Sequence, residues 1–152
     1  MIRAFLIVCY FLSLDVAAQV LQEGDDVFQK AVEVDRPVLI VFSGSDWCAP
    51  CIRFDQNVLS QEKFRSFVEE TIVVYRADFP QRKKLPKQVQ HANELLADKY
   101  NSRGLFPHLV LVAADETWVH VLQYDHEPID DFIKKIQVHI DHAQTQGASK
   151  TK

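Results

Sequence analysis

Residues 43–51 read Ser-Gly-Ser-Asp-Trp-Cys-Ala-Pro-Cys, and they separate two segments of different character. The run before them, 38–42, is wholly apolar and predicts a central strand with both faces covered. The segment 50–58 predicts a helix that begins at the two cysteines. Cys48 would lie at the helix N-terminus, where unpaired N–H groups and the helix dipole favour a thiolate. Cys51, one turn further on, could close a disulfide with it.

A Cys-x-x-Cys spacing alone is a weak signal, because it also occurs in half of a zinc site or as two buried cysteines. Zinc usually takes four ligands, and the chain has three cysteines and no histidine near the pair in sequence. The third cysteine, Cys9, lies in a segment that we expect to be removed. The position of the pair between a strand and a helix favours a redox pair over a metal site.

Residues 1–18 have the pattern of a secretory signal peptide. Arg3 gives a positive start, residues 4–14 are apolar, and Val-Ala-Ala precedes Gln19. We expect cleavage before Gln19, which would remove Cys9 and place the mature protein in the periplasm or outside the cell. An uncleaved anchor and a buried first strand are the alternatives for this segment.

Composition predicts one soluble domain. The chain has 152 residues, with 47% apolar and 25% charged residues, and its formal net charge of −4 argues against nucleic acid as a partner. We expect a signal peptide at 1–18, a folded domain at 19–143 and a disordered, polar tail at 144–152.

Apolar periodicity and turn residues predict alternating helices and strands. The expected segments are helix 21–35, strand 38–42, helix 50–58, a helix from the capping residue Ser60 to 70, strand 72–78, helix 86–100, strand 108–113, strand 118–122 and a last helix from 128. Alternation implies parallel strands joined by right-handed crossovers, and the final two strands imply an antiparallel hairpin. The fold class is therefore α/β, with a mixed central sheet, a C-terminal antiparallel hairpin and helices on both faces.

The pentapeptide at 47–51, Trp-Cys-Ala-Pro-Cys, resembles the active site of the thioredoxin superfamily, whose usual form is Trp-Cys-Gly-Pro-Cys. The longer run from Phe42 is similar to that of exported bacterial thioredoxin-like proteins, and as a pattern the resemblance covers about 27–140. It implies a thioredoxin fold, Cys48 as the exposed attacking thiolate and Cys51 as the resolving thiol. It implies no metal and no organic cofactor.

The resemblance also implies a substrate-contacting surface formed by Trp47, Pro50, Phe106 and Pro107. Pro107 matches the cis-proline that lies against the disulfide in this family, and an ordinary trans loop proline is the alternative. The alternative role for Trp47 is packing within the protein, without contact to a substrate. Phe106 replaces a smaller Thr, Ile or Val and would reshape the groove. Phe42 stands where cytosolic thioredoxins place a buried Asp that takes a proton from the resolving cysteine.

Two hypotheses follow. The first is an exported thiol–disulfide oxidoreductase, acting as a monomer that reduces protein disulfides and is recharged by a membrane electron donor. The same chemistry in reverse would oxidise substrates. The second is a metal-handling or non-catalytic binding module, in which Cys48, Cys51 and His108 would hold copper or zinc if His108 points toward the pair. A basic run, Arg82-Lys83-Lys84, either steers an acidic partner or is a solvated turn.

Overall fold

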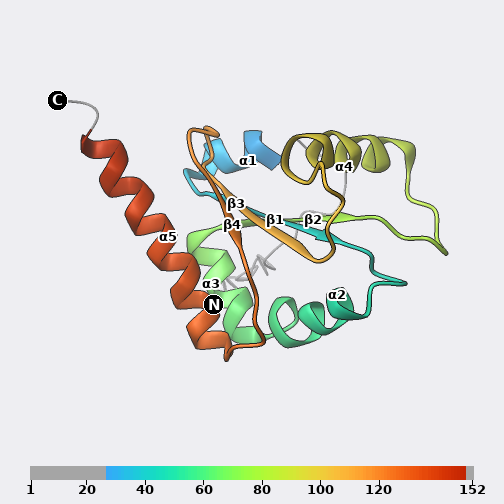
Figure 1. Ribbon diagram of the computed structural model, residues 1–152. Coiled ribbons are helices and arrows are strands. Elements are labelled where there is room, and N and C mark those ends of the chain that lie inside the picture. Colours follow the sequence, from blue (N-terminus) through green and yellow to red (C-terminus); the bar gives the residue numbers. More distant parts are fainter. Residues whose placement is uncertain (1–26, 150–152) are drawn as a thin grey trace, which may run out of the picture.

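The computed structural model describes residues 27–149, so the predicted signal peptide and the start of the first predicted helix lie outside the described residues. The elements follow one another (Figure 1) as α1 (Val27–Val34), β1 (Val38–Ser43), α2 (Ala49–Phe54), η1 (Asp55–Leu59), α3 (Glu62–Thr71), β2 (Val73–Asp78), α4 (Lys87–Tyr100), β3 (His108–Val112), β4 (Val119–Leu122) and α5 (Ile129–Ser149). The predicted α/β class and order of elements are confirmed for this part of the chain.

Within the described residues the sheet has four strands in the order β2-β1-β3-β4. β1 and β2 are parallel, whereas β3 is antiparallel to both of its neighbours, so the predicted mixed sheet with a terminal hairpin is confirmed. The parallel pairing that alternation implied for β3 is wrong. Residues 101–107 lead the chain from the end of α4 back to the carboxyl end of β1, where His108 pairs with Phe42.

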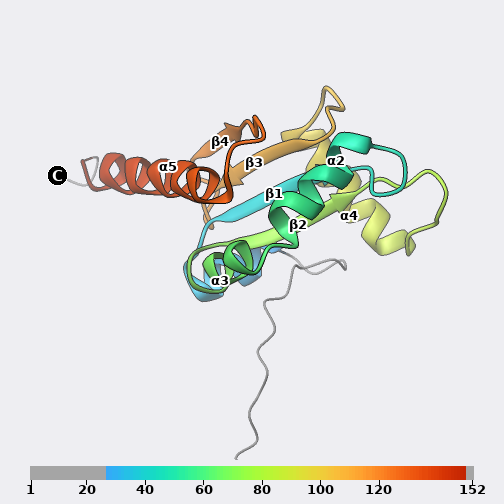
Figure 2. The ribbon, with the colours of Figure 1, turned by 90° about the horizontal axis from the view of Figure 1, so that it is seen from below.

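The side chains of β1 alternate between two hydrophobic cores, one on each face of the sheet. Leu39 and Val41 belong to a core completed by α2, η1, α3 and α5, and Ile40 and Phe42 belong to one completed by α1 and α4. Figure 1 shows α1 and α4 above the sheet, and Figure 2 views it from the side of α2, α3 and α5. Every residue of β1 is buried, which is why this strand is an unbroken apolar run.

The predicted helix at 50–58 is two elements. The α-helix α2 ends at Phe54 and continues as η1, a wider π-helical turn in which the Ser60 N–H donates to the Asp55 carbonyl at 2.8 Å. The wider turn places two consecutive apolar residues, Val58 and Leu59, in the core together. Ser60 therefore closes η1, and the prediction that it caps α3 is wrong, because Gln61 precedes that helix.

α5 continues to Ser149, so residues 144–149 of the expected tail are helical. Within this segment the Thr145 hydroxyl donates back to the carbonyl groups of Asp141 and His142 in the preceding turn. The last turns project past the sheet in Figure 1. No helix among the described residues is both long and apolar enough to cross a membrane.

Candidate active site

The two cysteines form a disulfide at the point where β1 gives way to α2. Cys48 is the N-cap residue of α2, and its sulfur accepts a hydrogen bond from the Cys51 N–H at 3.2 Å. The Cα atoms of the pair are 5.2 Å apart. The predicted position of Cys48 at a helix N-terminus is confirmed, so in the reduced protein an N–H group would face its sulfur and stabilise a thiolate.

Neither cysteine is exposed in this oxidised form. Cys48 is 5% exposed and Cys51 2%, so the expected exposure of Cys48 is wrong here. The sulfur of Cys48 is bonded to Cys51 and turned toward the first turn of α2, which removes it from solvent.

Three aromatic side chains pack together next to the segment that carries Cys48. The ring of Phe106 makes edge-on contacts with Trp47, at 5.4 Å between centroids, and with Phe79, at 5.6 Å. The Trp47 indole N–H donates to the Phe79 carbonyl at 2.7 Å. A methyl group on Gly44 would lie 2.3 Å from Trp47 Cε2, so only glycine leaves room for the indole here. The sequence indicated Trp47 and Phe106, and it gave no sign of Phe79.

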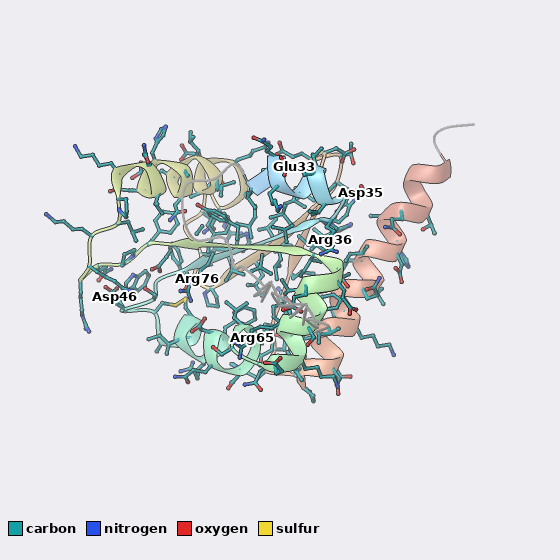
Figure 3. The ribbon with its side chains drawn as sticks, turned by 180° about the vertical axis from the view of Figure 1, so that it is seen from behind. Glu33, Asp35, Arg36, Asp46, Arg65 and Arg76 are labelled. Carbon is teal, nitrogen blue, oxygen red and sulfur yellow. A yellow bond between two sulfur atoms is a disulfide. The ribbon has the colours of Figure 1, made fainter. Side chains whose placement is uncertain are left out.

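Residues 45–47 are bonded to the segment 78–83 that follows β2, and we call these contacts the clasp. Ser45 donates through its N–H and its hydroxyl to the Asp78 carboxylate, at 2.8 and 2.6 Å. The Asp46 carboxylate accepts from three consecutive backbone N–H groups, those of residues 81–83, at 2.7–3.3 Å. Figure 3 shows Asp46 at the end of the molecule, beside the loop that it holds.

The clasp shifts the titration of Asp46. Partial desolvation raises the pKa of this carboxyl, but the three N–H donors and the charge of Arg82 outweigh it and hold the pKa below its usual 3.8. Asp46 is therefore ionised at neutral pH, and its carboxylate accepts hydrogen bonds from the loop. It is the carboxylate nearest to the cysteines in sequence, and its three hydrogen bonds hold it on the loop after β2.

A cavity begins at Pro50, which lies between the two cysteines in the chain. Pro50 and Pro107 line a cavity of about 720 Å³ together with Tyr124, and the Phe106–Pro107 peptide bond is cis, as the resemblance implied. The loop that carries Pro107 is braced by buried Asn101, whose side-chain amide donates to the Leu105 carbonyl and accepts from the Leu105 N–H, both at 2.9 Å. We call residues 101–107 the cis-proline loop.

His108 faces away from the cysteines. It pairs with Phe42 across the β1–β3 ladder, its ring lies 6.0 Å from the Phe42 ring, and its Nε2 is 3.2 Å from the Tyr100 carbonyl. Burial, opposed by that carbonyl and aided by Arg103, lowers its pKa, so a neutral ring donates from Nε2 to Tyr100. The condition for a His108 metal site is not met, and among residues 27–149 no three His, Cys, Asp or Glu side chains are grouped as ligands.

Phe42 is fully buried and leaves no carboxylate at the position where cytosolic thioredoxins have one. Of the six predicted site residues, Cys48 and Cys51 form the disulfide, Trp47 contacts Phe106, and Pro50 and Pro107 line one cavity. Sequence reasoning missed the residues that hold them. Asp78 and Asn101 were assigned only to a strand and a turn, and for Asp46 the turn position was the sole clue.

A family model described as thioredoxin-like matches residues 19–114 of the chain. The chain belongs to this thioredoxin-like family. Its relatives include the disulfide bond reductase DsbH of Chlamydia pneumoniae, with 32% identity over 80 residues, which are 53% of this chain and 48% of DsbH. The thioredoxin-related protein DsbJ of the same organism is 26% identical over 95 residues, 62% of this chain and 27% of DsbJ. The aligned segment thus spans about half of one relative and about a quarter of the other.

Solved structures agree with this thioredoxin-like assignment. A DsbH oxidoreductase superposes with a TM-score of 0.70 at 25% identity, covering 82% of this chain and 87% of that one. A thioredoxin from Thermus thermophilus superposes with a TM-score of 0.53 at 18% identity, covering 75% and 81%, which supports the fold alone.

Proposed function

We propose that this thioredoxin-like protein is a thiol–disulfide oxidoreductase that reduces disulfides in other proteins. The observation that carries the proposal is the Cys48 sulfur, which accepts the Cys51 N–H at the start of α2. A thiolate at this position is stabilised by that donor and by the helix dipole, and the thiolate is the attacking species in disulfide exchange. The relative named a disulfide bond reductase supports the same chemistry.

The reaction begins from the dithiol form. The Cys48 thiolate attacks one sulfur of the substrate disulfide, forms a mixed disulfide and releases the other substrate sulfur as a thiolate, which takes up a proton. Cys51 then loses its proton and attacks the Cys48 sulfur, which closes the disulfide seen here and releases the second substrate thiol. Two electrons and two protons pass to the substrate, and an external dithiol must supply them again.

The direction we propose is reduction. An oxidising pair needs a strongly stabilised reduced form, and here Ala49 and Pro50 offer no side-chain donor or charge to the Cys48 sulfur. We expect a potential nearer to the roughly −270 mV of thioredoxin than to the roughly −120 mV of a strong oxidase. Titration against dithiothreitol or glutathione measures it. A potential above about −160 mV would favour disulfide formation instead.

The activity is tested by the reduction of insulin with dithiothreitol as the electron source. We expect the wild type to accelerate precipitation of the insulin chains, and the Cys48→Ser variant to match the uncatalysed rate. Addition of copper or zinc to parallel samples separates reduction from metal handling. A wild type no faster than dithiothreitol alone, but with a stoichiometric metal bound, would replace the oxidoreductase by the metal-handling alternative.

The proposed site of action is outside the cytoplasm, on the strength of the sequence at 1–18. A monomer there would need a membrane electron donor, because cytosolic reductants are absent. Mass spectrometry of the protein from its native cell should find a chain that begins near Gln19. An intact Met1 on a cytoplasmic species would contradict export and the membrane donor.

A further inference from the structure

The loop after β2 forms one wall of a groove of about 520 Å³ that is separate from the cavity beside Pro107. We call this the basic groove. Its lining combines apolar surface with three lysines, and the residues that matter here are Phe79, Pro80, Lys83, Lys84, Leu85 and Lys87. The run of basic residues is therefore one rim of a concave surface.

The clasp fixes the conformation of this loop. Six hydrogen bonds join residues 45–47 to the segment 78–83, and three of them end on the Asp46 carboxylate. At the start of the loop, Asn93 of α4, which is 1% exposed, donates to the Asp78 carbonyl. A solvated turn needs no such anchoring, so the alternative of a merely solvated basic run is disfavoured.

The lysines of the groove keep their charge available. Lys83, Lys84 and Lys87 are exposed, and none of them forms an ion pair among the described residues. The groove also contains two carboxylates, but that of Asp78 is bonded by Ser45 and that of Glu94 by Gln90. The rim is therefore positively charged, whereas the chain as a whole has a formal net charge of −4.

The groove contacts two aromatic residues that belong to the candidate active site. The Phe79 ring touches Phe106, which precedes the cis-proline, and the Phe79 carbonyl holds the Trp47 indole, which precedes Cys48. We propose that the basic groove binds an acidic segment of the partner polypeptide whose disulfide Cys48 attacks. This proposal rests on the proposed function and adds a selectivity to it.

An acidic polypeptide fits the groove better than a simple anion does. Lysine charges at a rim steer an oppositely charged partner and raise its association rate, while Phe79, Pro80 and Leu85 offer apolar contact to side chains next to the acidic ones. Rim charges of this kind change the rate of encounter more than the lifetime of the complex, so the effect should depend strongly on salt.

The test compares two peptides that carry the same intramolecular disulfide, one flanked by four glutamates and the other by four serines. The second-order rate constant of the reduced full-length protein with each peptide is measured by chromatography of the thiol products. Measurements are made at ionic strengths of about 0.02 M and about 0.5 M, where the screening lengths are roughly 20 Å and 4 Å. The proteins are the wild type, Lys83→Glu/Lys84→Glu and the control Lys30→Glu/Lys134→Glu, which changes the net charge equally on α1 and α5.

We expect the wild type and the control to prefer the acidic peptide by about three- to tenfold at low salt, and the preference to vanish at high salt. In Lys83→Glu/Lys84→Glu the ratio should fall to one or below. Equal rates for both peptides in the wild type, or a preference that survives in Lys83→Glu/Lys84→Glu, would overturn the proposal.

A binding measurement separates this proposal from the proposed function. A dye-labelled acidic peptide without cysteine should bind the wild type with a salt-sensitive anisotropy change, and Lys83→Glu/Lys84→Glu should lose it. If no peptide is reduced but this binding remains, the reductase function fails and the groove assignment stands. No binding, or binding only to anionic phospholipid vesicles, would overturn the groove assignment.

Discussion

The two sides of the Cys48–Cys51 disulfide are held by different kinds of contact. Toward β2, residues 45–47 are bonded to the loop after that strand, and the rings of Trp47, Phe79 and Phe106 pack against one another. Toward β3, Pro50 and Pro107 face a cavity whose loop is braced from within by Asn101. The first side is held by hydrogen bonds, and we call it the closed side. The second borders a cavity, and we call it the open side.

This difference suggests that the two sides of the disulfide have different roles in the reaction of the Cys48 sulfur. The open side leaves room for the substrate backbone and the departing thiol near Pro107, while the closed side fixes Trp47 and carries the lysines that would select a partner. Variants on the two sides should therefore separate general from selective effects on the reaction.

The largest effect is expected at the disulfide itself, which serves both sides. Cys48→Ser should lower the reduction rate by about three orders of magnitude or more, because no nucleophile remains. Cys51→Ser should also stop turnover but accumulate mixed disulfides, which non-reducing electrophoresis detects. Equal alkylation rates of Cys48 and Cys51 in the reduced wild type would contradict this assignment of roles.

The next effect concerns the open side. Asn101→Ala removes both hydrogen bonds to the Leu105 backbone, so we expect a loss of about 1–2 kcal/mol in the free energy of unfolding. The reduction rates of acidic and neutral peptides should fall together, because in the proposed function the cis-proline loop contacts substrates of either charge. Chemical denaturation and the peptide assay measure both, with exposed Ser102→Ala as the control. A fall in the reduction rate of acidic peptides alone would contradict the different roles of the two sides.

Two glycine variants test how each side is shaped. Gly44→Ala would force the Trp47 ring to move, at a cost of about 1–3 kcal/mol in unfolding free energy. Gly104→Ala has open space around the new methyl, but its φ of +62° disfavours alanine, and we expect about 1 kcal/mol. Denaturant midpoints give both values. Only Gly44→Ala should change the fluorescence of Trp47, measured in a Trp118→Phe background. A spectral change in Gly104→Ala would mean that the two sides are coupled.

The sequence predicted those features that depend on neighbours along the chain. The redox pair, the buried strand before it and the order of elements all follow from local patterns, and the resemblance supplied the cis-proline. The clasp could not be predicted, because Asp46 and the amides it binds are 35–37 residues apart and any exposed carboxylate has the same pattern. The orientation of β3 likewise depends on the path of the cis-proline loop, which composition does not specify.

The smallest effect is a pH dependence of the clasp. Because the pKa of Asp46 lies below 3.8, the folded state holds the ionised form more strongly than the unfolded chain does. The stabilisation is fully present above 3.8 and is lost as the pH falls through the lowered pKa. Amide exchange of residues 81–83 should therefore stay slow, relative to intrinsic rates, at pH 5 and accelerate below about pH 3.8.

Asp46→Asn supplies the decisive comparison for this effect. The amide oxygen still accepts hydrogen bonds but carries no charge, so the three N–H groups should be less protected at pH 5 and should show no further change on acidification. The amide of Leu105, in the cis-proline loop, is bonded to an uncharged side chain and serves as the internal reference. If Leu105 loses protection in step with residues 81–83, the acid effect is global unfolding, and the clasp has no titration of its own.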